Sequence, residues 1–317
     1  MNEQTYTPSG KLPPAYWLFF ALFSLVGIPI LSVAYIYLVH YIPYIYLCFF
    51  LTIGCGAGLG AVIALAVKLG KARNPIVVAI SAGVAALVMK YVQWCVYVPL
   101  IFDEVYDYNE YNYGEAYTVG EQLLESVSYL LHPLWVFADA KTINEYGVWG
   151  FSQGGGAVTG VFLVIIWLLE LVIIVGVVVL IPMNRVRHPY SEWGDAWYKK
   201  SDQVFESDIP DDFPRILNDF TSGNVAPLAD LIRAGRTDTA LYLRYVFLTP
   251  PDGGSSSEPY FMSVTRFTVD SKNKAQSAKI VNDLLVARSK YREIKEAIND
   301  SRPVAADTPP APVDDYA

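Results

Sequence analysis

Charged residues are scarce in this sequence, and so are the side chains on which most catalytic and metal sites depend. Asp, Glu, Lys and Arg make up 17% of the 317 residues, and there are only three cysteines and three histidines. The cysteines lack the spacing of a disulfide framework or a zinc finger. Nucleophile triads, phosphate-binding loops and zinc signatures are also missing, so we expect no metal, no cofactor and no enzymatic activity. An enzyme without a recognisable motif is the alternative.

A basic surface is missing as well, because the formal net charge is −8. Domains that bind nucleic acids carry clustered Lys and Arg residues, so no nucleic-acid partner is expected. The negative charge is concentrated in residues 103–150, where one cluster consists of Asp103, Glu104, Asp107 and Glu110. This cluster either concentrates cations near the membrane or is an ordinary solvated loop, and we favour the solvated loop.

Long apolar runs are abundant, and hydrophobic residues make up 53% of the chain. Four runs cover residues 16–39, 44–67, 76–101 and 156–182. Each exceeds the roughly 20 residues that a helix needs to cross a bilayer. The first run is too long for the core of a signal peptide, so we expect it to be retained. The sequence therefore predicts an integral membrane α-helical protein with four transmembrane helices.

The distribution of Lys and Arg predicts the orientation of these helices. The connection between the second and third runs carries Lys68, Lys71 and Arg73, and basic residues also follow the fourth run. Connections rich in Lys and Arg remain cytoplasmic, so both termini are expected inside the cell. The outer loop has no N-x-[ST] sequon, which fits a cell membrane of the bacterial inner type.

Aromatic and basic side chains near the ends of the runs predict contacts with the membrane surface. An outer aromatic belt is expected from Tyr35, Tyr37, Tyr41, Tyr44 and Tyr46, and an inner one from Trp193, Trp197 and Tyr198. Anionic lipid headgroups are the expected contacts of Arg185, Arg187, Lys199 and Lys200. The alternative is that these basic residues only fix the orientation of the helices in the membrane and form no specific lipid site.

Two charged residues interrupt the apolar runs, Lys90 in the third and Glu170 in the fourth. Counted from the cytoplasmic ends of their helices, they stand at roughly 21 and 18 Å, which is nearly the same depth. A lone charge at the centre of a bilayer costs about 2.5–3.5 kcal/mol, and pairing offsets part of that cost. We therefore predict an intramembrane ion pair between Lys90 and Glu170, within one chain or between subunits.

The helical faces agree with such a pair. Lys90 shares a stripe with Gln93 and several small residues, and Glu170 shares one with Trp167 and further small residues. Small residues allow helices to approach closely, so the pair is expected inside the bundle. We favour a structural role in which the pair fixes the register of the helices. A protonatable or ion-coordinating site is the alternative.

The glycine-rich run at residues 54–61 lacks the spacing of a dinucleotide-binding loop. Gly54 and Gly58, and likewise Gly56 and Gly60, have the four-residue spacing of helix-packing pairs. We expect both pairs to pack against neighbouring helices.

The chain is expected to have five parts. They are a polar leader (1–13), a transmembrane domain (14–183) with the extracytoplasmic loop 103–150, a juxtamembrane interfacial segment (184–200), a cytoplasmic α+β domain (201–300) and a disordered tail (301–317). Within the loop, residues 121–131 have a helical pattern that Pro133 ends.

The cytoplasmic domain has helical patterns at 211–220 and 226–235 and strand-like patterns at 239–248 and 260–269. Turn residues between the two strands predict a β-hairpin. After Ser271, apolar residues recur at spacings of four and three, at Ile280, Leu284, Ala287, Tyr291, Ile294 and Ile298. This spacing predicts a long C-terminal helix that covers the hairpin.

Parts of the membrane half resemble uncharacterised bacterial multi-pass membrane proteins. The segments concerned are NEYGVWGF, GGAVTGVFLVIIWLLELVIIVG and YIPYIYLCFFLTIGCGAGLG. The resemblance implies a multi-pass topology and no activity.

These features favour a membrane-anchored, non-enzymatic scaffold or complex subunit, whose cytoplasmic domain binds a protein partner or a second copy of the chain. The alternative is an ion- or proton-conducting component that uses Glu170, Lys90 and the outer acidic residues. The sequence indicates no particular small-molecule substrate.

Overall fold

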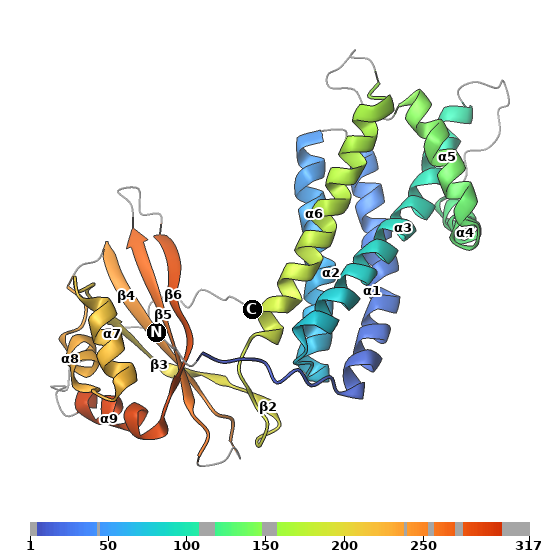
Figure 1. Ribbon diagram of the computed structural model, residues 1–317. Helices are drawn as coiled ribbons and strands as arrows, with labels where there is room; N and C mark the ends of the chain where they lie inside the picture. Colours follow the sequence, from blue (N-terminus) through green and yellow to red (C-terminus); the bar gives the residue numbers. More distant parts are fainter. Residues whose placement is uncertain are drawn as a thin grey trace. The chain divides into compact units, whose positions relative to one another are not determined.

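The computed structural model describes residues 5–42, 45–107, 118–147, 157–237, 240–252, 257–269 and 275–299. The chain forms two compact units (Figure 1). The helical unit is Pro8–Arg187, and the sheet unit combines Met1–Thr7 with His188–Ala317. The predicted tail at residues 301–317 lies outside the described residues.

Four described helices of the helical unit are long and apolar enough to cross a membrane. They are α1 (Pro14–Tyr41), α2 (Ile45–Gly70), α3 (Pro75–Asp107) and α6 (Gly160–Val186). Pro14 and Pro75 suit the first positions of their helices, because the first residue of a helix has no intrahelical amide bond to lose. The four predicted spans are therefore confirmed as long apolar helices, which indicates a multi-pass membrane protein.

Helix α2 packs against both α1 and α6, and its glycines make this possible. A Cβ atom added at Gly56 or Gly60 would lie 3.2 or 3.0 Å from a side chain of α6. At Gly58 it would lie 3.0 Å from Leu31 of α1, and at Gly54 it would meet nothing within 4 Å. The prediction for Gly56 and Gly60 is thus confirmed. In the other pair, Gly58 packs against α1 as expected, whereas the prediction for Gly54 is wrong, because it meets no neighbouring helix among the described residues.

Two shorter helices, α4 (Val119–Leu131) and α5 (Pro133–Tyr146), lie between α3 and α6 in the sequence. The predicted helical pattern that ends before Pro133 corresponds to α4, whereas α5 was not expected. Thr118 starts α4 through a capping box, in which its backbone N–H donates to Glu121 Oε2 at 2.8 Å and its hydroxyl accepts from the Glu121 N–H at 3.3 Å. The bond from the Thr118 backbone holds the pKa of Glu121 below its usual value.

The sheet unit contains a four-stranded antiparallel sheet in the order β3-β4-β5-β6. Its strands are β3 (Lys199–Ser207), β4 (Leu241–Thr249), β5 (Tyr260–Val269) and β6 (Ala275–Val286), preceded by the ribbon of β1 (Tyr190–Ser191) and β2 (Ala196–Trp197). One face is covered by α7 (Phe213–Ser222), α8 (Ala226–Ala234) and α9 (Arg288–Asn299) (Figure 1). Residues such as Phe220 and Ile294 pack there against Phe247 and Met262. The predicted hairpin and the two predicted short helices are confirmed.

The long C-terminal helix predicted after Ser271 is wrong, because Ala275–Val286 is the strand β6 and only Arg288–Asn299 is helical. The predicted stripe does not follow one face of the strand, because Leu284 is buried whereas Ile280 and Ala287 are exposed. β6 also contains a β-bulge. Val281 lies opposite Val264 and Leu284 lies opposite Met262, so three residues of β6 match two of β5. Asp283 within the bulge has a φ of 43°. The bulge puts Val281 and Leu284, three residues apart, on the same buried face. The predicted stripe contains Ile280 and not Val281, so its helical spacing does not follow the buried face of β6.

The N-terminal leader is part of both units. Thr5 forms a bridge with Leu284, and the backbone N–H of Tyr6 donates to the Asp283 carbonyl at 3.1 Å, so this end of the chain extends the edge of β6. Further along, the N–H of Gly10 donates to the Arg73 carbonyl at 3.1 Å, in the connection between α2 and α3. The sequence alone predicted a polar leader and no partner for it.

Candidate functional site

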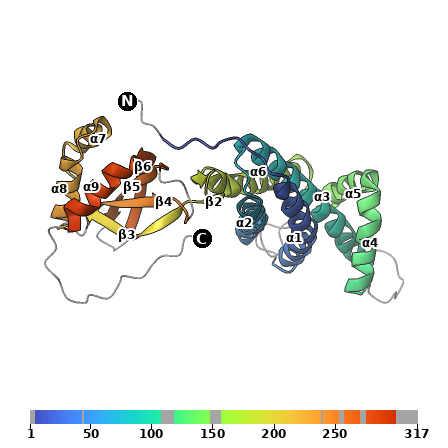
Figure 2. The ribbon, with the colours of Figure 1, turned by 90° about the horizontal axis from the view of Figure 1, so that it is seen from below.

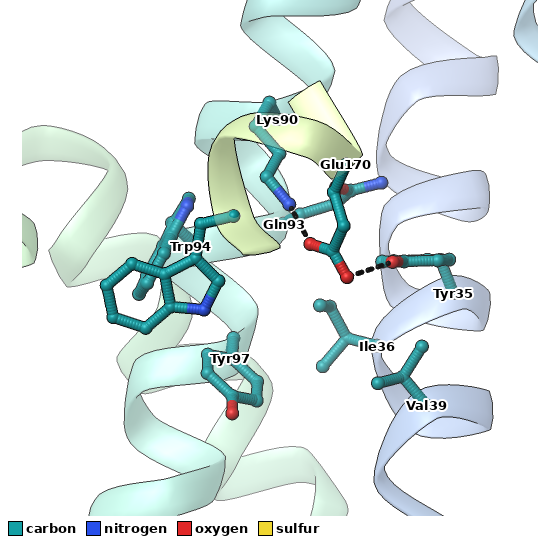
Figure 3. Close-up of a pocket in the computed structure, with 9 residues that line it drawn as sticks. Tyr35, Ile36, Val39, Lys90, Gln93, Trp94, Tyr97 and Glu170 are labelled. Atoms are coloured by element: carbon teal, nitrogen blue, oxygen red, sulfur yellow. Dashed lines mark hydrogen bonds and ion pairs between the residues drawn. The ribbon is translucent and has the colours of Figure 1, made fainter. Parts of the chain in front are cut away.

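Lys90 of α3 and Glu170 of α6 form an ion pair inside the helical unit (Figure 3). Lys90 Nζ lies 2.9 Å from Glu170 Oε2, and the two side chains are 13% and 9% exposed. The other carboxylate oxygen, Oε1, accepts a hydrogen bond from the Tyr35 hydroxyl of α1 at 3.2 Å. Both oxygens of Glu170 therefore have a partner from another helix.

A hydroxyl group from α2 extends this network. The Tyr35 hydroxyl lies 3.0 Å from Thr52 Oγ1, and Thr52 donates to the Cys48 carbonyl at 2.8 Å. Tyr35, Thr52, Lys90 and Glu170 each come from a different long helix. We call these four residues the polar network. Because its members hydrogen-bond across all four helices, the network resists sliding or rotation of any one of them.

A cavity of about 30 Å³ lies beside the ion pair, between α1, α3 and α6 (Figure 3). Gln93, which is 1% exposed, lines it and donates through Nε2 to Cys55 Sγ at 3.4 Å, while its Oε1 has no hydrogen-bond partner among the described residues. Trp94 and Trp167 form another wall, with their rings edge to face at 4.7 Å. The cavity is large enough for a single water molecule, and Gln93 Oε1 and the ion pair offer it polar partners.

The remaining residues singled out in the sequence are not members of the polar network. Asp103, Glu104 and Asp107 belong to the last part of α3, where only the backbone is described, and Glu110 lies outside the described residues. Among the residues that the structure describes, no group of three or more His, Cys, Asp or Glu side chains could hold a metal ion. The acidic cluster therefore stays a prediction.

The basic residues proposed to contact lipid headgroups are divided between the two units. Arg185 lies in the last turn of α6 and Arg187 follows it. Lys199 and Lys200 begin β3, and Lys199 Nζ lies 3.1 Å from Asp252 Oδ2. The end of the segment 184–200 is therefore part of the sheet, and its contact with a membrane surface stays a prediction.

Two members of the polar network were not identified as site residues from the sequence. Tyr35 was assigned to the outer aromatic belt, yet it is buried. Thr52 was not singled out. A signal was present, since Ser32 and Tyr35 are polar residues one turn apart on an otherwise apolar helix, and such residues face the interior of a bundle. Tyr198 was likewise assigned to the inner belt and is buried, where it donates to the Pro259 carbonyl at 2.9 Å.

The sequence was also compared with known proteins. The four apolar helices agree with the multi-pass topology that the resemblance to bacterial membrane proteins implied. A scan against protein-family models gives no match, and neither a search of curated proteins nor a search of solved structures gives one.

Proposed function

We propose that this protein is a membrane-anchored, non-enzymatic scaffold or complex subunit. Its four long helices cross the membrane, the polar network holds them together, and the sheet unit binds a protein partner or a second copy of the chain. The observation that carries this proposal is the pairing of both Glu170 oxygens, with Lys90 and Tyr35. A carboxylate whose partners are supplied by neighbouring helices stabilises the bundle and is poorly placed to bind a substrate.

Charge and chain topology support an arrangement with both termini in the cytoplasm. Lys68, Lys71, Arg185 and Arg187 all lie at one end of the long helices, and connections rich in such residues stay inside. The pairing of Thr5 with Leu284 places the beginning of the chain in the same unit as the segment after α6. Both flanks of the helical unit therefore belong on one side of a cell membrane.

Capture of the full-length protein tests the scaffold role. A tagged chain, purified in detergent from its native membrane, is expected to elute as a stoichiometric complex with a partner or with itself. A chain ending at Arg187 is expected to lose that complex while retaining the elution profile of a folded helical unit. A full-length protein that is always a lone monomer would contradict the proposal.

A proton or ion pathway is the second candidate, favoured by Gln93 Oε1, which lies beside the ion pair and has no hydrogen-bond partner in the described part of the chain. We expect liposomes that contain the protein to show no proton or cation flux above that of protein-free liposomes. Flux that Glu170→Gln abolishes, and that the exposed control Glu121→Gln leaves unchanged, would reverse the ranking of the two functions.

A further inference from the structure

We propose that α4 is an interfacial membrane helix, whose apolar face lies among lipid acyl chains and whose polar face points to headgroups and water. The proposal rests on insertion of the four long helices in a bilayer. It adds a surface that the scaffold role does not require.

The side chains of α4 divide into three faces around the helix. Gln122, Ser126 and Tyr129 are one turn apart and are turned toward the protein, where Ser126 is buried. A second face is apolar and consists of Val119, Leu123, Leu124, Val127, Leu130 and Leu131. The third face is polar and exposed, and consists of Glu121, Glu125, Ser128 and His132. A helix with separate apolar and polar faces is typical of the membrane interface.

The apolar face is uncovered by the described part of the chain. Leu124 is 71% exposed and Leu131 is 72% exposed. In α5, Leu134, Trp135 and Phe137 are exposed as well. An exposed apolar surface of this size requires an apolar environment, whereas the polar face beside it requires water or headgroups.

Hydrogen bonds attach α4 to two of the long helices at a depth within their apolar spans. The Tyr37 hydroxyl of α1 donates to Gln122 Oε1 at 3.1 Å, near the start of α4. The Tyr91 hydroxyl of α3 lies 3.1 and 3.0 Å from the carbonyls of Tyr129 and Leu130, near its end. Tyr37 stands four residues before the end of α1 at Tyr41, and Tyr91 stands ten residues before the end of the apolar run 76–101, so α4 is attached within the outer half of these spans.

The direction of α4 agrees with a helix that lies in the plane of a membrane. Figure 1 shows it end-on beside α3, and Figure 2, turned by 90°, shows it lengthwise. It therefore runs across the direction of the long helices. A helix attached to α1 and α3 within their spans exposes its apolar face at the depth of the acyl chains, which identifies lipid as the occupant of that face.

Site-directed spin labelling in phosphatidylcholine vesicles tests the proposal. The three native cysteines are buried, so the wild-type chain serves as the labelling blank. Nitroxides are attached at Leu124→Cys and Ser128→Cys, with Leu168→Cys on the exposed face of α6 as the lipid control and Asp211→Cys as the water control. Accessibility to oxygen, which partitions into lipid, is compared with accessibility to a water-soluble nickel chelate.

The label at Leu124 is expected to match the lipid control, with an oxygen-to-nickel ratio several-fold above that at Asp211, while the label at Ser128 matches the water control. Three outcomes would overturn the proposal: a water-like label at Leu124, a lipid-like label at Ser128, or low accessibility of both labels to both reagents. Failure of membrane insertion itself would be recognised separately, by a water-like label at Leu168.

Discussion

Lys90→Met is expected to lower the free energy of unfolding of the helical unit by about 3 kcal/mol. Methionine has a similar length but no charge, so the variant leaves Glu170 inside the bundle with the Tyr35 hydroxyl as its remaining partner among the described residues. Glu170→Met is expected to cost a similar amount, because it leaves the Lys90 ammonium without its carboxylate. The measurement is unfolding of the purified protein in mixed micelles, followed by circular dichroism as the denaturing detergent is increased.

Joint replacement of Lys90 and Glu170 by methionine tests whether the two residues act as one structural pair or stabilise the protein independently. Because neither charge is then left alone, the double variant is expected to be more stable than either single variant. Lys141→Met is the matched control, since its ion pair with Glu145 is long, at 3.9 Å, and solvent-exposed. That variant is expected to change stability by less than about 0.5 kcal/mol. Single variants as stable as the wild type would contradict the role of the pair.

Gly70→Ala is expected to destabilise the helical unit by about 3 kcal/mol, at the upper end of the cost of overpacking. A Cβ atom at this position would meet Tyr16 Cα. It would also lie 2.7 Å from Tyr16 N. Backbone atoms cannot rotate aside as a side chain can, so the start of α1 would have to separate from the end of α2. The same unfolding measurement detects the loss.

Gly54→Ala provides the control on the same helix. No atom lies within 4 Å of a Cβ at Gly54, and alanine is favoured over glycine in a helix by up to about 1 kcal/mol. This variant is therefore expected to be as stable as the wild type or slightly more stable. If both alanine variants destabilise the protein equally, the loss of stability reflects a general sensitivity of α2 to substitution. That result would refute the close contact between Gly70 and Tyr16.

The sequence predicted the long helices and the depth of their charged residues well, because helix length and hydropathy depend on local composition. It placed Lys90 and Glu170 at one level by counting residues along straight helices. It did not identify Tyr35 or Thr52. The spacing of Ser32 and Tyr35 indicated an inward face of the first helix, but nothing in the sequence indicated which helix would supply a partner for these hydroxyl groups. Their role depends on which helices are neighbours, and that is a property of the folded bundle.

The sheet unit was harder to predict for two physical reasons. Ile280, Leu284 and Ala287 have the spacing of a helix, although Leu284 is buried and the other two are exposed. At the opposite edge, β3 begins with KKSDQ, and an edge strand with so many polar residues lacks the apolar alternation by which strands are recognised. The paired strands β4 and β5 were predicted because they are rich in β-branched and aromatic residues and have strong turn residues between them.

The bridge between Thr5 and Leu284 has a consequence for biosynthesis. The first residues leave the ribosome early, whereas their pairing strand is completed only after all four apolar helices have been synthesised. The edge of the sheet thus closes as one of the last steps of assembly, and it joins a segment before the first apolar helix to a strand after the last one. A bulky fusion placed immediately before Thr5 would sit at that edge.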